Sequence, residues 1–271
     1  MDPVINKGKH SVLGVMIDAV DYEYAVDRVT TAADNREPLA LTALAVHGVM
    51  TGVDDPDHEA RLNSFDLAVP DGQPVRWALN LMYDTQLADR VYGPDLTGYV
   101  LAELAERGLP VFLYGSTPQT LDALSQALPA QFPGLEIAGM QPSGFRSAQP
   151  GEAERIASQI RASGARCVLV GLGCPRQEQF VHALREHLDL PLLAVGAAFD
   201  YHAGQLHRPP PWMQRHGLEW LWRLGLEPRR LWRRYLILNP RFAARLVGQR
   251  TGIWHPRPAA PQRRTPESFP V

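Results

Sequence analysis

Polar side chains follow several apolar runs of this 271-residue sequence, and Asp71 is the first with the potential for chemistry. It lies in "DLAVPDG" (66–72), where Asp-Gly is either a turn-forming pair or the site of a carboxylate placed for a reaction. A hairpin requires strand-like alternation on both sides of the pair. Downstream, however, Val75, Leu79 and Met82 have helical spacing. We therefore expect Asp71 at a strand-to-helix junction, where both roles stay open.

A second candidate is the glycine-containing segment after "PVFLY" (110–114). Ser116 or Thr117 can cap the following helix, with Pro118 in its first turn. Gly115 would let a ligand approach the backbone, and a helix N-terminus favours phosphate, although ordinary strand-to-helix loops look the same. The sequence contains neither a Walker A motif nor G-x-G-x-x-G.

A third candidate is "GLGCPRQE" (171–178), which follows the apolar run "CVLV". A structural loop needs the glycines, but it does not need Arg, Gln and Glu clustered together. We interpret Cys174 as a packed thiol, because no local motif ties a histidine to it. The predicted ligand-binding residues of this segment are Gly171, Gly173, Pro175, Gln177 and Glu178.

Asp200 follows the apolar run "PLLAVGAAF" (191–199). Its carboxylate either holds a sugar hydroxyl or caps a turn, and the local sequence does not choose between these roles. His202, His207 and His216 are interpreted as loop and surface residues, since no acidic partner lies at metal-ligand spacing. No metal site is predicted.

These candidates need a scaffold, and the chain alternates short apolar runs with helical segments. Strands are predicted at 10–18, 39–46, 66–72, 110–115, 135–140, 167–173 and 191–200. Helices are predicted at 23–34, 57–65, 74–82, 95–108, 117–133, 152–164 and 176–188. Such alternation predicts a Rossmann-like α/β fold, with a mainly parallel sheet and helices on both faces. Ligands bind such sheets at the carboxyl ends of the strands, where the candidates fall.

The formal charge of −2 conceals a strong asymmetry along the chain. Residues 1–207 carry 14 Lys/Arg against 26 Asp/Glu, whereas residues 208–271 carry 13 Arg against 3 Glu. Five of the six tryptophans also lie in the second part. Two cysteines are too few for a disulfide framework, and no signal peptide or membrane span is expected.

The basic segment 207–250 is predicted to form amphipathic helices at 218–224 and 227–238. Within a continuous helix, Arg223, Arg230, Arg234 and Arg241 would share one face. Arginines beside tryptophans favour an anionic membrane surface or a diphosphate. Nucleic acid is the less favoured partner, because the acidic body would repel it. Residues 1–206 are thus the predicted core, 207–250 an appendage, and 251–271 a Pro-rich tail expected to be disordered.

Together these segments resemble the WecG/TagA/CpsF family of bacterial glycosyltransferases, glycosyltransferase family 26. The resemblance runs in order over residues 10–240. Its motifs are "HGVM" (47–50), "PDGQPVRWA" (70–78), "RVYGPDL" (90–96), "VFLYGSTP" (111–118), "FPGLEIAGMQPSGF" (132–145), "VGLGCPRQEQF" (170–180), "VGAAFDYHAGQLHRPPPWMQRHGLEWLWRL" (195–224) and "EPRRLWRRY" (227–235).

The resemblance implies an inverting transfer of a hexose from a UDP-sugar to an undecaprenyl-diphosphate-linked sugar. The hexose would be of the N-acetylmannosamine or glucose type, and the new linkage β. The reaction would take place on the inner face of the bacterial plasma membrane, without a metal or other cofactor, in a peripheral protein that forms homo-oligomers. A non-catalytic scaffold or a nucleotide-binding regulator of polysaccharide assembly is the alternative.

The resemblance also implies roles for individual residues. Asp71 matches the proposed catalytic base and Thr42 the threonine near it. Where many members have Asn, this chain has Leu44, and His47 is expected to take a polar role there. Arg90 and Gln177 match motif residues and are expected to be catalytic together with Asp71 and Thr42. The appendage arginines expected to reach the donor diphosphate are Arg223, Arg230 and Arg233.

Overall fold

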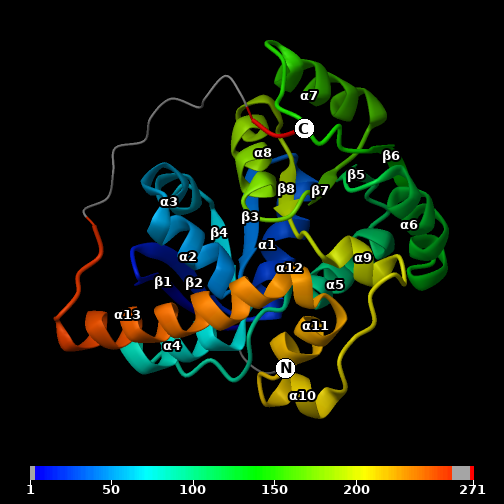
Figure 1. Cartoon of the computed structure of the whole chain (residues 1–271). Helices are drawn as coiled ribbons and strands as arrows, with labels where there is room; N and C mark the ends of the chain where they lie inside the picture. The colour runs from blue at the N-terminus through cyan, green and yellow to red at the C-terminus, as the bar shows by residue number, and fades with distance from the viewer. Residues whose placement is uncertain (1–3, 258–268) are drawn as a thin grey trace.

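The computed structural model describes residues 4–257 and 269–271, except for the side chains of Pro211 and Arg230. At its centre six parallel strands form one sheet in the order β4-β3-β8-β7-β5-β6 (Figure 1). Their bounds are β3 (Leu39–Leu44), β4 (Leu67–Pro70), β5 (Val111–Gly115), β6 (Ile137–Gln141), β7 (Cys167–Gly171) and β8 (Pro191–Ala194). The predicted α/β class with a parallel sheet is confirmed.

Helices cover both faces of this sheet because its strands are apolar on both sides. Alternate residues such as Leu113 and Leu169 pack against α1 (Tyr22–Asn35), α5 (Gly93–Glu106), α6 (Pro118–Gln131) and α9 (Ala198–His202). Their neighbours Phe112 and Val168 pack against α7 (Glu152–Ser163) and α8 (Arg176–Leu184) on the opposite face. Strands buried on both faces are typical of parallel sheets.

One prediction about the N-terminal half was wrong, and one helix there was not predicted. The run 10–18 is not one strand; it belongs to an antiparallel hairpin of β1 (Asn6–Val12) and β2 (Val15–Val20). The two-residue turn is Leu13-Gly14, with φ of 58° and 98°, so a buried leucine conceals it within the apolar run. Helix α2 (Val46–Asp54) was not predicted, because it follows β3 directly and Ala45 provides no side-chain cap.

Other elements follow the expected pattern of caps. Thr117 caps α6, accepting a hydrogen bond from the Thr120 amide at 3.2 Å, with Pro118 in the first turn. Helices α3 (Pro56–Asn63) and α4 (Gln73–Tyr83) lie where helices were predicted. The last predicted strand ends early, at Ala194, because Gly196 (φ 51°) turns the chain into α9.

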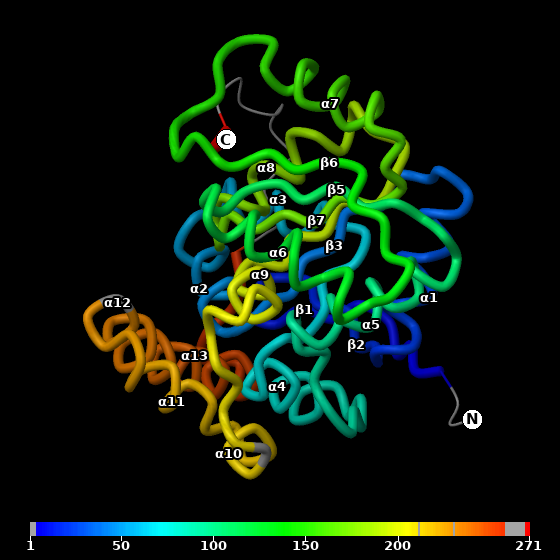
Figure 2. Tube along the Cα trace, turned by 90° about the vertical axis from the view of Figure 1, so that its right-hand side faces the viewer, coloured from blue at the N-terminus to red at the C-terminus, as the bar shows by residue number. Residues whose placement is uncertain are grey.

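The C-terminal appendage consists of α10 (Pro211–Arg215), α11 (Glu219–Leu226), α12 (Pro228–Arg233), a π-helical turn (Arg234–Leu238) and α13 (Asn239–Thr251). Figure 2 shows α10 to α13 on the side of the molecule opposite α7. Pro240 lies in the first turn of α13. The π-helical segment runs directly into this helix, because the backbone angles at the junction stay helical. None of the described helices is both long enough and apolar enough to cross a membrane.

Helix α13 is docked on the body rather than extended from it. Phe242 and Leu246 are buried in a cluster formed by the hairpin, α2 and α4. The Gln249 amide bonds to the turn of the hairpin, accepting from the Leu13 amide at 2.9 Å and donating to the Ser11 carbonyl at 3.2 Å. The appendage is therefore continuous with the core that carries β4 and Asp71.

The end of the chain differs from the expected disordered tail. Phe269 and Val271 are buried against α8 and the sheet, and Pro270 forms an isolated bridge with Ser147. The Ala148 amide donates to the Phe269 carbonyl at 2.6 Å. Residues 258–268 of that predicted tail lie outside the described residues.

The packing of α13 predicts that Phe242→Ala lowers the free energy of unfolding by about 3 kcal/mol, since it empties a buried ring site. Val247→Ala is the matched control on the same helix, because Val247 is 60% exposed, and we expect less than about 0.5 kcal/mol. Urea denaturation of both variants measures the difference. Equal stabilities would show that α13 does not fold as part of the core.

Candidate active site

The carboxyl ends of the central strands meet at one edge of the sheet and line a cavity of about 440 Å³. This volume lies in the range of small-molecule sites. A smaller cavity of about 100 Å³ adjoins it, between β4 and the appendage. Six residues line both cavities: Ala45, His47, Asp71, Tyr92, Arg223 and Arg234.

Asp71 lies where the two cavities meet, directly after β4. Its amide donates to the Leu44 carbonyl at 3.1 Å, which joins it to the neighbouring strand. Its Oδ1 accepts from the Gly93 amide, at the start of α5, at 2.6 Å. Burial raises the pKa of the Asp71 carboxyl to about 6, and the nearby Arg90 and the Gly93 amide oppose this rise only in part. The junction of strand and helix is as predicted, and the carboxylate is oriented by the backbone.

Arg90 connects Asp71 to the appendage. It forms a buried ion pair with Glu219 of α11, and its guanidinium lies 4.3 Å from the centroid of the Tyr92 ring. Sequence reasoning missed Glu219, although it is one of only three acidic residues after residue 207. The ion pair holds α11 against the strand end that carries the carboxylate.

Gln177, Glu178 and Thr42 form a buried network beneath the larger cavity. Gln177 accepts from the Gly173 amide at 3.1 Å and donates to Glu178 Oε1 at 2.9 Å and the Ala194 carbonyl at 3.2 Å. The Thr42 hydroxyl donates to the same Glu178 oxygen at 3.1 Å. Of the three, only Gln177 lines the cavity, so Thr42 and Glu178 support the loop from below.

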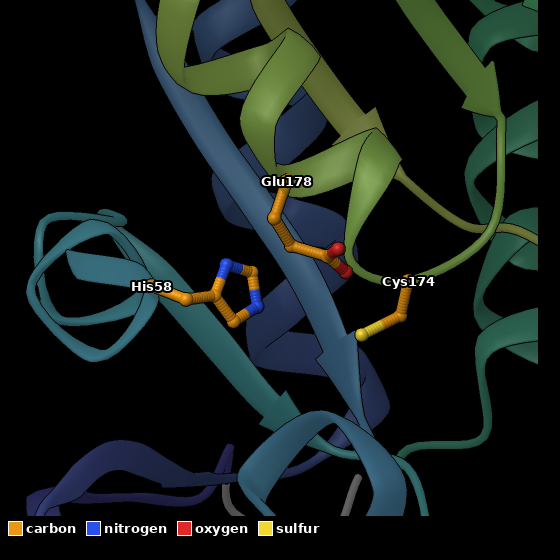
Figure 3. A group of neighbouring side chains, drawn as sticks. All are labelled: His58, Cys174 and Glu178. Atoms are coloured by element: carbon orange, nitrogen blue, oxygen red, sulfur yellow. The ribbon is translucent and has the colours of Figure 1, made fainter. Parts of the chain in front are cut away.

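His58 and Cys174 extend this network to a group of three potential metal ligands with Glu178 (Figure 3). Their ligand atoms lie within 4.8 Å of one another. However, Arg61 donates to His58 Nδ1 at 3.0 Å, so in the neutral ring the proton is on Nε2, the atom a metal would need. Burial also raises the pKa of the Cys174 thiol well above its usual value. A protonated imidazole nitrogen and a packed, protonated thiol fit this group better than a metal site does. That the protein needs no metal stays a prediction.

The packing and backbone conformation around the predicted glycines require glycine at these positions. A Cβ at Gly115 would lie 2.9 Å from the Gly171 carbonyl oxygen, so the two strand ends approach closely. A Cβ at Gly171 would lie 2.5 Å from the Phe199 ring, and Gly173 has a φ of 74°. Gly171 and Gly173 line the larger cavity, whereas Gly115 and Pro175 lie outside its lining, with Ser116 at the cavity in place of Gly115.

Asp200 lies on α9, not at a strand end as predicted, and His202 lies on the same helix. Asp200 faces the larger cavity. His202 is buried, which corrects its interpretation as a surface residue: its Nδ1 lies 3.0 Å from Gln131 Oε1 and its Nε2 3.0 Å from the Pro94 carbonyl oxygen. His207 and His216 are exposed, as expected.

The appendage arginines divide into two groups. Arg223 lines both cavities, and its contact with a donor diphosphate stays a prediction. Arg233 is exposed and lies over the Trp232 ring, 5.2 Å from its centroid. The next residue, Arg234, lines both cavities instead. Arg241 forms an ion pair with Asp54 away from the site, and the Arg230 side chain lies outside the described part of the structure.

His47 joins this group from α2. It lines both cavities, and its Nδ1 is buried without a hydrogen-bond partner in the described part of the chain. Burial and the nearby Arg234 lower the pKa of His47 to about 4, so the ring is neutral at pH 7. Its predicted polar role at the site agrees with this position.

At this edge of the sheet, a carboxylate of raised pKa can accept a proton, and the arginines that line the same cavities can stabilise a leaving anion. The sequence model of the Glycosyl transferase WecG/TagA/CpsF family matches residues 10–255. The chain therefore belongs to this family of glycosyltransferases, which act in cell-surface polysaccharide synthesis.

The Arg90–Glu219 pair predicts that Glu219→Gln lowers the free energy of unfolding by about 3 kcal/mol, because it leaves a buried guanidinium without its partner. The control is Glu103→Gln, which breaks a pair with Arg107 whose side chains are 36% and 33% exposed, and it is expected to cost less than about 1 kcal/mol. Urea denaturation at pH 7 compares the two. A loss at Glu219 no larger than that at Glu103 would contradict the structural role of the pair.

Proposed function

We propose that the chain is an inverting hexosyltransferase with a UDP-sugar as donor and an undecaprenyl-diphosphate-linked sugar as acceptor. The hexose is of the N-acetylmannosamine or glucose type, and the new linkage is β. The observation that carries this proposal is the position of Asp71 at the junction of the two cavities, both of which Arg223 and Arg234 also line.

In the proposed reaction, the Asp71 carboxylate takes the proton of an acceptor hydroxyl. The hydroxyl oxygen forms its new bond to C1 of the donor sugar as the bond from C1 to the UDP oxygen breaks on the opposite side. The electron pair of the broken bond leaves with UDP, and Arg223 and Arg234 supply positive charge for it. Arginines in this role support a metal-independent reaction.

The level of the Asp71 pKa supports its role as the base. A value of about 6 leaves the carboxyl ionised at pH 7, and it makes the carboxylate a stronger base than an exposed aspartate. The Gly93 amide holds one carboxylate oxygen, which leaves the other for the acceptor hydroxyl. The carboxylate is therefore both charged and oriented before the acceptor binds.

We place the reaction at the inner face of the plasma membrane, with the appendage in contact with the lipid surface. Large apolar side chains support this placement, since they are exposed on the appendage at Trp212, Leu221, Leu226, Trp232, Leu236 and Ile237. A homo-oligomer of peripheral subunits is part of the same proposal.

A UDP-release screen of UDP-hexoses with a short-chain lipid-diphosphate sugar tests the function in the full-length protein. We expect Asp71→Asn to lower kcat by at least about 100-fold, since it removes the base, while UDP still binds. Near-normal turnover by this variant would contradict the proposed mechanism. UDP binding by the wild type without turnover on any sugar would favour the non-catalytic alternatives.

A stability measurement shows that the variant is folded. Because the pKa of Asp71 is raised from 3.8 to about 6, its carboxylate destabilises the folded state as the pH rises through this interval. At pH 7.5 the cost is on the order of 3 kcal/mol. Asp71→Asn is thus expected to unfold at higher urea concentration than the wild type at pH 7.5, and the two curves should converge at pH 4.

A further inference from the structure

The larger cavity extends across the sheet from one edge to the other. Asp71 follows β4, the strand at one edge, and Phe145 lies in the loop after β6, the strand at the opposite edge. Both residues line this cavity. Residues at the ends of the strands between them also line it: Leu44, Val195, Gly171 and Ser116. A substrate that reacts at Asp71 therefore extends along the strand ends toward Phe145.

Phe145 presents an aromatic ring that the protein itself leaves largely uncovered. The residue is 54% exposed, and its φ is 51°, a conformation that residues other than glycine rarely adopt. The neighbouring Arg146 is bound elsewhere, since its guanidinium donates to both carboxylate oxygens of the buried Glu152 at 2.8 Å. Residues in such strained conformations cluster at ligand-binding sites. The ring of Phe145 is therefore available to a ligand in the cavity.

Residues 269–271 hold the backbone around Phe145, and they lie beside α7 and α8 (Figure 1). The Val271 amide donates to the Arg146 carbonyl at 2.9 Å, and the Arg146 amide donates back to the Val271 main-chain oxygen at 3.4 Å. Ser143 Oγ donates to the same Val271 oxygen at 2.8 Å and accepts from the Phe145 amide at 3.0 Å. Ser143 thus connects the strained residue to the segment 269–271.

The Phe269 ring anchors this segment in the core. It is buried and lies edge-on to the Phe180 ring of α8, with 6.0 Å between the ring centroids. Phe180 in turn stacks on Tyr114 of β5 at 4.0 Å. Packing in the core therefore fixes the position of an exposed loop. Residues 269–271 lie beyond the part of the chain that matches the family, so this support is not part of the family pattern.

We propose that Phe145 stacks on the nucleobase of the sugar-nucleotide donor, and that residues 269–271 position it for this contact. In an inverting transfer the leaving nucleotide lies on the side of C1 away from the attacking hydroxyl. Its base therefore points away from Asp71 and toward Phe145. An aromatic ring stacks on the flat face of a base without needing a charge or a hydrogen bond. The choice of UDP rests on the proposed function, whereas the stacking contact needs only a nucleotide.

Calorimetry on the full-length protein tests the contact with the base. We expect Phe145→Ala to weaken UDP binding roughly 10- to 100-fold, and Phe145→Tyr, which keeps a ring, to weaken it less than about threefold. The base of 5,6-dihydro-UDP is not planar, so the wild type should bind it more weakly than UDP. Phe145→Ala should bind the two nucleotides about equally. If this variant binds UDP as the wild type does, or keeps the full preference for UDP, the proposal is wrong.

Two serines provide a matched test of the positioning role. Ser143 Oγ donates to a main-chain oxygen and accepts from the amide two residues later, and Ser163 Oγ makes the same two kinds of bond at the end of α7. We expect Ser143→Ala to weaken UDP binding about threefold, through the lost hydrogen bonds, and Ser163→Ala to leave it unchanged. Equal effects of the two substitutions would contradict the positioning role.

A double-mutant cycle separates positioning from a general loss of stability. We expect Phe269→Ala to weaken UDP binding about 5- to 10-fold, because an unanchored loop must be ordered when the nucleotide binds. KM for the sugar nucleotide should rise with kcat nearly unchanged. In the Phe145→Ala background the same change should weaken UDP binding less than about twofold, since the ring to be positioned is absent. An equal loss in both backgrounds would show that Phe269 does not act through Phe145.

Binding and turnover can fail separately. UDP binding that depends on Phe145, in a protein without turnover on any UDP-hexose, would overturn the proposed function and leave the stacking role standing. Binding of ADP, GDP or dTDP in place of UDP, with the same dependence on Phe145, would change the donor and support the stacking role. A wild type that binds none of these nucleotides would contradict the proposal.

Discussion

The ion pair of Arg90 with Glu219 is the interaction on which the site depends. It joins the segment between α4 and α5 to α11, and both side chains are buried, with the Arg90 guanidinium over the Tyr92 ring. Loss of either partner of a buried ion pair strongly destabilises a protein. The pair therefore holds the two segments together. Arg90 is thereby fixed close to Asp71, where its charge offsets part of the cost of burying the carboxylate. The fold thus maintains an aspartate of raised pKa that is still ionised at neutral pH.

The same arrangement explains why the appendage and the sheet form one site. The strand ends provide the backbone of the larger cavity, and Gln177 and Glu178 brace its loop from below. The sheet itself contributes no cation to the place where a leaving diphosphate would lie. Arg223 and Arg234 bring that charge from the appendage, whose last helix is buried against the hairpin and α2. The placement of these arginines beside the Asp71 carboxylate therefore depends on the docking of a segment more than 130 residues away along the chain.

Much of this organisation could be predicted from the sequence, since it rests on local patterns. The short apolar runs that alternate with helical segments predicted the parallel strands, and helical spacing after Gly72 placed Asp71 at a junction. The hairpin turn at Leu13 and the uncapped start of α2 could not be recognised, because neither has a polar signal. Partners distant in sequence were also out of reach: nothing near Glu219 indicates that it pairs with Arg90. The choice between Arg233 and Arg234 depends on the direction of a helix, which only its packing determines.

Asp71 is the proposed general base, and burial raises its pKa. The pH dependence of kcat/KM tests it most directly, since this quantity reports the ionisation of the free enzyme. We expect kcat/KM to fall about tenfold per pH unit below an apparent pKa of about 6 and to be nearly level from about pH 7 to pH 8. A rate that stays constant down to pH 4.5 would contradict it, because a base with this pKa would be protonated there.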